Sequence, residues 1–349
     1  MDSTRLPDYE GGSIVNLMQS IASACGSSGT RYPQLGAMTA AQLGAARHIV
    51  LLVIDGLGQR TLASHPASPN LQRNTLGTMT SVFPSTTASA ITTFMTGRAP
   101  AQHGLTGWHM YLDEIDQTLA ILPLTPRGEP AKMLPQALPM RLFDQQTLYQ
   151  QLDRECWVLA PQSIARSPFN AWHSRGAQSI AYNSLPEMFS RLAGLLHEAH
   201  MPRFIYAYYP DLDTISHCYG TDSEQAHQVL ASLDIAFGEF VQDVQGSDSW
   251  LIATADHGFI DSPPDRVINL AQHPHLAALL TRPLCGERRA AYCYVSKSRR
   301  RAFETYIRQS LGDCVDLRSS STLIAAGWFG SPPFHPLLAS RVGDYTLVM

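Results

Sequence analysis

Carboxylate and imidazole side chains recur in this chain where predicted strands end, and a hydroxyl-rich segment lies between the first of them and the rest. The residues at predicted strand ends are Asp55, Asp213, His217, Asp256 and His257, and a further histidine, His335, comes late in the chain. Side chains of these types bind divalent transition metals, and zinc in particular. A threonine or serine held beside two such ions can lose its proton and attack phosphorus. The combination predicts a metal-dependent hydrolase.

The hydroxyl-rich segment, residues 83–97, supplies the candidate nucleophile. It has a helical pattern over Thr87 to Met95, and Ser85 or Thr86 is a good residue to cap that helix. Backbone N–H groups and the positive end of the helix dipole stabilise an anionic oxygen at a helix start. The argument favours a hydroxyl at this position, and it leaves Thr86 and Thr87 both open.

Composition narrows the class of protein. The chain has 349 residues, of which 44% are hydrophobic and 15% charged, as expected of a globular protein with a sizeable core. The formal net charge of -4 provides no general positive field for nucleic acid or anionic membranes, so we expect no nucleic-acid polymer as a partner. A small anionic substrate would be attracted locally, by metal ions.

The location of the protein is predicted from what the sequence lacks. The N-terminus has no basic start followed by an apolar run, and no segment approaches the roughly 20 apolar residues of a membrane span. The six cysteines are scattered without a C-x-x-C pair, which indicates free thiols in a reducing compartment. We therefore expect a cytoplasmic protein that does not span a membrane.

The order of predicted elements indicates the fold class. A continuous apolar run at 48–54 is typical of a central strand buried on both faces, and a second strand is predicted at 78–83. Residues 108–145 are proline-rich and are predicted to form loops. Further along, predicted helices alternate with strands, namely helix 146–153 with strand 156–160, helix 184–199 with strand 203–209, and helix 222–244 with strand 250–255. This alternation predicts an α/β fold with a doubly wound, mostly parallel sheet and helices on both faces.

The same reading predicts three regions. Residues 1–46 form an N-terminal arm with one helical pattern, residues 47–269 and 331–349 form the catalytic core, and residues 270–330 form an inserted small α+β subdomain. The insert has a strand near 289–296, a basic helix at 298–310 and a short strand at 314–318. In a doubly wound sheet, ligands gather beyond the carboxyl ends of the strands. Because several of the candidate ligands follow predicted strands, we expect them to meet there.

The ordered set of motifs resembles the alkaline phosphatase superfamily, and within it the type I phosphodiesterase/nucleotide pyrophosphatase branch. The resemblance runs from about residue 47 to 349. Its motifs are Asp55-Gly56, the segment from Thr87 to Thr96-Gly97, Asp213-x-x-x-His217, Asp256-His257-Gly258, and His335. It implies an alkaline-phosphatase-like fold and a hydrolase with two metal ions, which we expect to be zinc, with manganese or iron as alternatives.

The resemblance also implies a role for each matching residue. In that family the nucleophile lies nine residues before the threonine of a Thr-Gly pair, which is Thr87 here, with Thr86 one step away. The ligand set implied for the first ion is Asp55, Thr87, Asp256 and His257. The set implied for the second ion is Asp213, His217 and His335, with Asp211 as a competitor of Asp213.

Two departures from the family pattern bear on the substrate. An aromatic residue that stacks on a nucleobase usually follows the nucleophile, but Ala88 stands there. An asparagine about 21 residues beyond the nucleophile is replaced by Trp108, with His109 next to it. Trp108 and His109 are therefore candidate substrate-binding residues, or else the leaving group is not a nucleoside.

Three functions remain open from the sequence. The first is cleavage of phosphodiester or pyrophosphate bonds in a small phosphorylated substrate through a phospho-threonine intermediate. The second is a phosphomonoesterase or phosphonate hydrolase of the same superfamily. The third is an inactive protein that binds metal and phosphate. The sequence makes no prediction of the oligomeric state.

Overall fold

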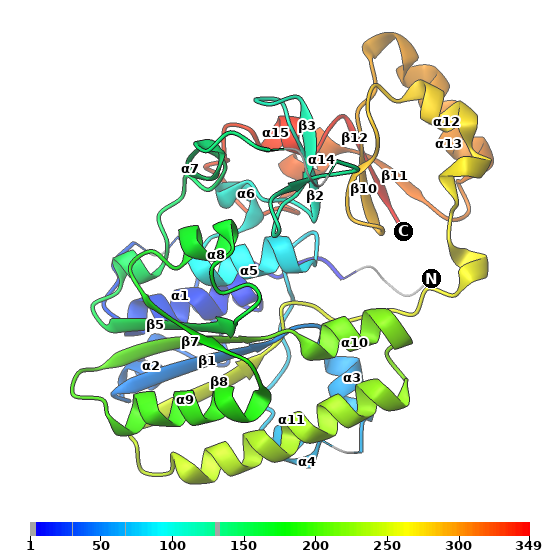
Figure 1. The fold of residues 1–349 in the computed structure, drawn as a ribbon. Coiled ribbons are helices and arrows are strands. Elements are labelled where there is room, and N and C mark those ends of the chain that lie inside the picture. The colour runs from blue at the N-terminus through cyan, green and yellow to red at the C-terminus, as the bar shows by residue number, and fades with distance from the viewer. Residues whose placement is uncertain (1–4, 30, 67, 130–132) are drawn as a thin grey trace. The chain divides into compact units, whose positions relative to one another are not determined.

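The computed structural model describes residues 5–29, 31–66, 68–129 and 133–349 (Figure 1). The first four residues of the predicted arm and residues 130–132 of the predicted loop region lie outside the described residues. The chain divides into two compact units. Unit 1 contains residues 1–81, 93–97 and 143–261, and unit 2 contains residues 82–92, 98–142 and 262–349.

Unit 1 is built on a parallel sheet of five strands in the order β6-β5-β7-β1-β8. Its strands are β1 (His48–Ile54), β5 (Glu155–Pro161), β6 (Gln178–Tyr182), β7 (Arg203–Tyr209) and β8 (Ser249–Thr254). Every residue of β1 is buried, because β1 lies between β7 and β8 and both of its faces are covered. The predicted central strand at 48–54 is confirmed.

Helices cover both faces of this sheet, as predicted (Figure 1). The face of β1 that presents Val50, Leu52 and Ile54 packs against α9 (Leu185–His197) and α11 (Glu224–Asp243). Helix α1 (Ile14–Ala24) lies on the opposite side of the sheet (Figure 1). The remaining helices of unit 1 are α2 (Ala40–Gly44), α3 (Gln59–Ser64), α4 (Pro69–Arg73), α8 (Pro168–His173) and α10 (Asp211–Tyr219).

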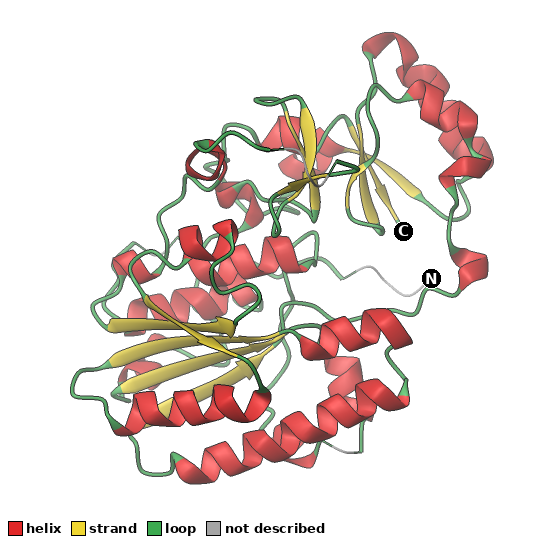
Figure 2. Ribbon diagram, in the orientation of Figure 1, coloured by secondary structure: helices red, strands yellow, loops and turns green. Residues whose placement is uncertain are grey.

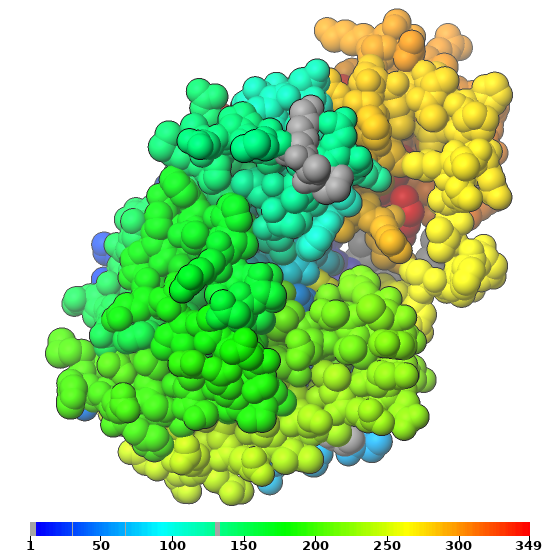
Figure 3. Space-filling view, viewed as in Figure 1, coloured from blue at the N-terminus to red at the C-terminus, as the bar shows by residue number. Residues whose placement is uncertain are grey.

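The surface of unit 1 that is visible in Figure 3 is formed largely by the green to yellow-green part of the chain, which contains α9, α10 and α11. Within the described part of the chain, every helix is too short or too polar to cross a bilayer.

Unit 2 is built on an antiparallel sheet of seven strands in the order β11-β12-β10-β9-β2-β3-β4 (Figure 2). These are β2 (His109–Leu112), β3 (Gln117–Ala120), β4 (Thr125–Pro126), β9 (Cys285–Gly286), β10 (Ala290–Cys293), β11 (Asp316–Ser319) and β12 (Tyr345–Val348). Its helices are α6 (Pro100–His103), α7 (Leu138–Leu142), α12 (Pro274–Leu279), α13 (Arg300–Ser310), α14 (Ser320–Ala325) and α15 (Leu338–Arg341). The remaining α-helix, α5 (Thr87–Thr96), has residues in both units.

The antiparallel sheet joins the predicted insert to neighbouring parts of the chain. Strand β12, from the predicted final core segment, pairs with β10 and β11, which lie in the insert. On one side of these strands, Phe303 and Ile307 of α13 complete a small apolar core. The division into arm, core and insert stays a prediction.

Three local predictions were wrong. Residues 78–83 form no strand, because only Thr80 makes a bridge, to Ser13, and no extended partner lies alongside. Residues 108–145 contain β2, β3, β4 and α7 rather than loops alone, since Asp116 takes a left-handed conformation (φ 50°) that allows a tight hairpin. Within 146–153, only the 3₁₀ turn Tyr149–Gln151 is helical. The sequence analysis also missed β6 and α8.

Candidate metal centre

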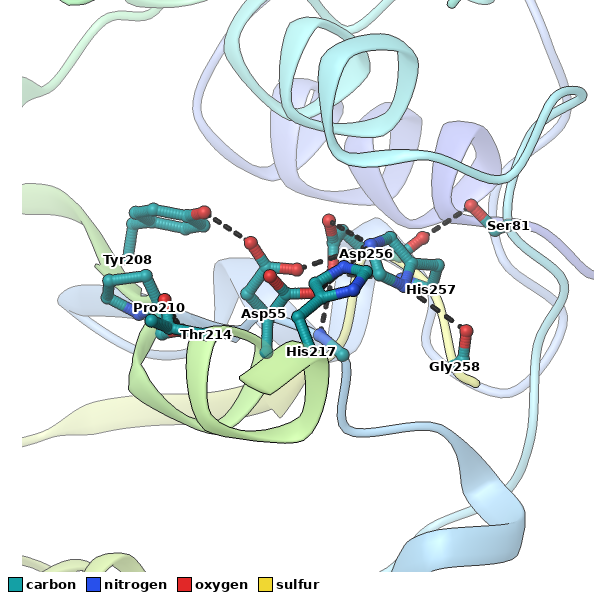
Figure 4. A network of polar contacts seen from close by, with 11 residues as sticks. Asp55, Ser81, Tyr208, Pro210, Thr214, His217, Asp256, His257 and Gly258 are labelled. Atoms are coloured by element: carbon teal, nitrogen blue, oxygen red, sulfur yellow. Dashed lines mark hydrogen bonds and ion pairs between the residues drawn. The ribbon is translucent and has the colours of Figure 1, made fainter. Parts of the chain in front are cut away.

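Three neighbouring parallel strands of unit 1 end at the same edge of the sheet, and an acidic residue lies shortly after the end of each strand. Asp55 follows the last residue of β1, and Asp256 comes two residues after the end of β8. Strand β7 ends at Tyr209 and leads into α10, which carries Asp213. Since β1 pairs with both β7 and β8 in parallel, the carboxyl ends of all three strands meet (Figure 4). Asp55 and Asp256 are almost fully buried, at 2% and 0% exposure.

Protein hydrogen bonds fix one oxygen of each of the two buried carboxylates. Oδ1 of Asp256 accepts the backbone N–H groups of Gly56, at 3.1 Å, and of His257, at 2.9 Å. Oδ2 of Asp55 accepts the hydroxyl of Tyr208 (Figure 4). Among the described residues, Oδ2 of Asp256, Oδ1 of Asp55 and Oδ1 of Asp213 accept no hydrogen bond, apart from one that the Asp55 and Asp256 carboxyl groups share with each other.

These three oxygens converge on one imidazole nitrogen. Nε2 of His257 lies 3.3 Å from Oδ1 of Asp55, 3.5 Å from Oδ2 of Asp256 and 3.8 Å from Oδ1 of Asp213. Asp55, Asp213, Asp256 and His257 are called the strand-end cluster below. One ligand atom from each of Asp55, Asp213 and His257 lies within 4.8 Å of the other two.

The imidazole of His257 is oriented for metal binding. Its Nδ1 lies 3.2 Å from the carbonyl oxygen of Gly258, which can only accept, so Nδ1 carries the proton (Figure 4). Nε2 therefore faces the three carboxylate oxygens. A protonated ring would pair with these oxygens, and a neutral ring would share a divalent cation with them. Tetrahedral zinc with bonds of about 2.0–2.1 Å places its ligand atoms about 3.3–3.4 Å apart, close to the spacing in the cluster.

Burial sets the ionisation of these acids in the absence of a cation. Burial and the nearby carboxylate of Asp256 hold the pKa of Asp55 well above its ordinary value. Burial also raises the pKa of Asp256 to about 6, against the hydrogen bonds that its carboxylate accepts. The pKa of Asp213 is raised by burial as well, although His257 and His217 oppose the shift. A bound cation would reverse these shifts, because it favours the charged carboxylates.

Helix α10 adds a second histidine beside the cluster. His217 lies one turn after Asp213, and its Nε2 is 3.4 Å from Oδ1 of Asp213. The His217 side chain is 67% exposed. Asp211, the competitor of Asp213, interacts with Tyr209 instead, and burial raises its pKa. The geometry therefore brings Asp213, rather than Asp211, to the cluster.

The other predicted site residues belong to unit 2. Helix α5 begins at Thr87, and the carbonyl of Thr86 accepts the N–H of Ala90, so Thr86 stands at the cap and Thr87 at the first helical position. Both threonines are 8% exposed. These observations agree with the helix predicted from the sequence. The role of either hydroxyl stays a prediction.

His335, Trp108 and His109 have defined surroundings within unit 2. His335 is 6% exposed, and its Nδ1 accepts the N–H of Leu337 at 3.1 Å, so the neutral ring carries its proton at Nε2. Metal binding through Nε2 would require this hydrogen bond to break. The backbone N–H of Trp108 donates to Glu287, and burial lowers the pKa of His109. Roles for these three residues stay predictions.

Sequence reasoning missed residues that contact the cluster, and two of them form hydrogen bonds with it. One is Tyr208, which comes one residue before the end of β7 and pairs in register with Val53, two residues before Asp55. The other is Ser81, whose hydroxyl donates to the backbone carbonyl of Asp256 (Figure 4). Both contacts depend on strand register or on the path of a distant loop, which a single sequence does not specify.

Comparison with known proteins identifies the family. The model of the type I phosphodiesterase/nucleotide pyrophosphatase family matches residues 49–322. The chain belongs to this family. The match includes Asp55 and the rest of the strand-end cluster, together with Thr87, whereas His335 lies beyond it.

A curated relative and several solved structures are similar to this type I phosphodiesterase/nucleotide pyrophosphatase family member. An uncharacterized pyrophosphatase/phosphodiesterase of Schizosaccharomyces pombe is 25% identical over 152 residues, which are 38% of this chain and 31% of the relative. The chain thus matches about a third of the length of that relative.

The similar structures include an inactive threonine-to-alanine variant of murine ectonucleotide pyrophosphatase/phosphodiesterase 5 in complex with AMP. Its TM-score is 0.61 at 15% identity, and the match covers 86% of this chain and 78% of the murine one. Phosphonoacetate hydrolase from Sinorhizobium meliloti 1021, in complex with phosphonoformate, has a TM-score of 0.63 at 16% identity. That match covers 92% of this chain and 83% of the hydrolase. These likenesses establish the alkaline-phosphatase-like fold.

Proposed function

We propose that this protein is a two-metal phosphohydrolase that cleaves phosphodiester or pyrophosphate bonds through a phospho-threonine intermediate at Thr87. The observation that carries the proposal is the strand-end cluster, in which three buried carboxylate oxygens face Nε2 of His257 at 3.3, 3.5 and 3.8 Å. Buried acids with raised pKa values, gathered at the edge of a parallel sheet, are costly for stability and typical of function. Membership of the family supports the same reaction class.

The proposed ligand sets are those that the family motifs imply. Asp55, Asp256, His257 and Thr87 would hold one divalent ion, and a second set, Asp213, His217 and His335, would hold the other. Bound there, the two ions lower the pKa of a hydroxyl group and neutralise charge on a phosphoryl group. Zinc suits this mixture of imidazole and carboxylate ligands best, with manganese or iron as alternatives.

The proposed reaction has two displacements. The Oγ1 atom of Thr87 loses its proton and attacks phosphorus, and the bond between phosphorus and the leaving oxygen breaks. The leaving alcohol or phosphate departs with a proton, and Thr87 carries the phosphoryl group as an ester. Water then attacks the same phosphorus, the bond to Oγ1 breaks, and the threonine hydroxyl is restored. The place of Thr87 at the start of α5 supports this role, because exposed N–H groups at a helix start stabilise an anionic oxygen.

Phosphonate hydrolysis is the second candidate, and one observation favours it. Ala88 follows Thr87 and is fully buried, so it offers no ring to a nucleobase. A small substrate without a nucleoside agrees with this, and the fold shared with phosphonoacetate hydrolase is compatible with such a substrate.

The test compares substrates and variants of one preparation loaded with zinc. We expect faster turnover of bis-p-nitrophenyl phosphate than of p-nitrophenyl phosphate, and the reverse order would favour a monoesterase. Phosphonoacetate is assayed in parallel. Thr87→Ala should abolish turnover while the bound zinc stays near two ions per chain, and Thr86→Ala is the matched control that should retain activity. Full activity of Thr87→Ala would refute the proposed nucleophile. A protein that binds two zinc ions yet cleaves none of these substrates would instead be an inactive binding protein.

A further inference from the structure

Two glycine-containing loops of unit 1 lie in direct backbone contact beside the strand-end cluster. One follows β1 and contains Gly56 and Gly58, and the other follows His257 and contains Gly258. A Cβ atom on Gly58 would lie 2.6 Å from Cα of Gly258, and a Cβ atom on Gly258 would lie 2.8 Å from Cα of Gly58. Real Cβ atoms do not approach other atoms so closely. The contact therefore requires glycine on both sides.

The side chain of Phe259 packs against Gly56 in the first of these loops, in the space beside its Cα atom. A Cβ atom on Gly56 would lie only 2.4 Å from Cε2 of Phe259, so the ring occupies the space where a side chain would stand. Gly56 also has a φ of +76°, which disfavours any other residue. The phenyl ring thus lies against the backbone of the loop that follows β1.

The same ring contacts both histidines of the centre. Its centroid lies 5.1 Å from the ring of His217, with an interplanar angle of 82°. It lies 5.5 Å from the ring of His257, with an interplanar angle of 84°. Perpendicular pairs at these distances are favourable for aromatic rings. One phenyl group therefore supports two imidazoles that come from different elements, α10 and the loop after β8.

We propose that Phe259 is a positioning residue that holds the imidazoles of His217 and His257 in the orientation that binds metal. The proposal rests on the proposed function, since it assigns those two rings to metal ligation. Histidines on a surface lose side-chain freedom when they bind an ion, and prior packing reduces that loss. Phe259 thereby improves metal affinity without touching metal or substrate.

The two histidines should depend on Phe259 to different degrees. The His257 side chain is 10% exposed, and its Nδ1 is bonded to the carbonyl of Gly258. The His217 side chain is 67% exposed and lies in the last turn of α10. Loss of the phenyl ring should therefore weaken the ion bound by His217 more than the ion bound by His257.

The test measures metal affinity rather than activity. Metal-free protein is titrated with zinc in competition with a chromophoric chelator, which yields a dissociation constant for each of the two ions. Phe259→Ala should raise at least one constant roughly 10–100-fold, the range seen when residues behind metal ligands are removed. Phe259→Leu keeps an apolar side chain in the space beside Gly56 and should have a smaller effect. Ile260→Ala, at a neighbouring position that is 59% exposed, is the matched control and should leave both constants unchanged.

A double-mutant cycle separates positioning from general loss of structure. If Phe259 acts through His217, the effect of Phe259→Ala should shrink when His217 is already alanine, whereas a general structural defect would persist. Circular dichroism melts establish whether each variant is folded. If Phe259→Ala does not fold, the zinc dissociation constants of Phe259→Leu are compared with those of the wild type instead. Wild-type dissociation constants in a folded Phe259→Ala protein would overturn the inference.

The outcome also distinguishes this inference from the proposed function. Zinc-dependent hydrolysis by the wild type, with unchanged constants in Phe259→Ala, would refute the role of Phe259 alone. Weakened zinc binding in Phe259→Ala, with no ester cleaved by the wild type, would refute the phosphohydrolase and leave the role of Phe259 supported. A wild-type protein that binds no zinc would overturn both.

Discussion

Replacement of Asp256 by asparagine should make the metal-free protein more stable while it removes most of the stabilisation by zinc. Asp256 is fully buried, and burial raises its pKa to about 6. The ordinary pKa of an aspartate is about 3.9, so the shift is roughly 2 units. Each unit corresponds to 1.36 kcal/mol, so the ionised carboxylate costs the metal-free fold about 3 kcal/mol at pH 7.

The direction of the pH dependence follows from the raised pKa. The folded state keeps the proton to higher pH than the unfolded state, so the contribution to stability is fully present below about pH 4. It is lost as the pH rises through the folded-state pKa of about 6. Metal-free wild-type protein should therefore become less stable between pH 4 and pH 7, and the asparagine variant should lose less.

The amide of asparagine has the shape of the carboxylate that it replaces. Its oxygen can keep the two N–H bonds from Gly56 and His257, and its NH₂ group can donate to the carboxylate of Asp55, with which Asp256 shares a side-chain hydrogen bond. At pH 7 we expect the metal-free variant to melt about 4 °C above metal-free wild type. Zinc should raise the melting temperature of the wild type but have little effect on the variant, because one charged ligand is missing.

The assay is a set of thermal melts on chelator-treated protein at pH 5 and pH 7, with and without zinc. Asp153→Asn, which changes an exposed acid of the same unit, is the matched control and should leave all melts unchanged. A metal-free Asp256→Asn protein that melts below wild type at pH 7 would show that the buried charge is already compensated and would refute the electrostatic reasoning.

Three further predictions concern the support of the site and the fold. Tyr208→Phe removes the hydroxyl that donates to Oδ2 of Asp55 and should weaken zinc binding roughly 10–100-fold, as measured by chelator competition. Unchanged zinc affinity would mean that this hydrogen bond does not orient the carboxylate of Asp55. Asp234→Ala removes the carboxylate that accepts the N–H groups of Asn70 (3.0 Å) and Leu71 (2.7 Å) at the start of α4. Urea unfolding should therefore record a free energy of unfolding that is about 2–4 kcal/mol lower than in the wild type, and Asp234→Asn should give an intermediate value. The gain in melting temperature on zinc addition should grow from pH 5 to pH 7.5. The reason is that Asp55, Asp213 and Asp256 all have raised pKa values and must lose their protons before they bind zinc. An equal gain at both pH values would contradict the assigned ligands.

The parallel sheet was predictable because its signals are local. The seven-residue apolar run of β1 reports burial on both faces, and Asp55 directly after it indicates a strand end. The spacing of Asp213 and His217 predicted one helical face, and α10 has that geometry. Parallel pairing then brings the strand ends together, so the neighbourhood of Asp55, Asp213 and Asp256 followed from sequence and general rules of topology.

The rest depends on interactions between distant segments. The antiparallel sheet of unit 2 joins short strands from residues 109–126 with strands after residue 285, and each strand alone has too few residues to give a clear pattern. The contact of Tyr208 with Asp55 requires the register of β7 against β1. The contact of Phe259 with Gly56 requires two loops about 200 residues apart to meet. Periodicity within one window of sequence holds none of this information.

The order of strands in unit 1 has a consequence for how the protein is made. Strand β1 leaves the ribosome well before its neighbours β7 and β8, which begin 155 and 201 residues later, at Arg203 and Ser249. At synthesis rates of about 5–20 residues per second, this apolar strand waits roughly 8–30 s for its first partner. During that interval the nascent chain depends on chaperones or on transient contacts to avoid aggregation. Ribosome-bound chains that end before Arg203 should accordingly be captured by chaperones more strongly than chains that extend past Thr254.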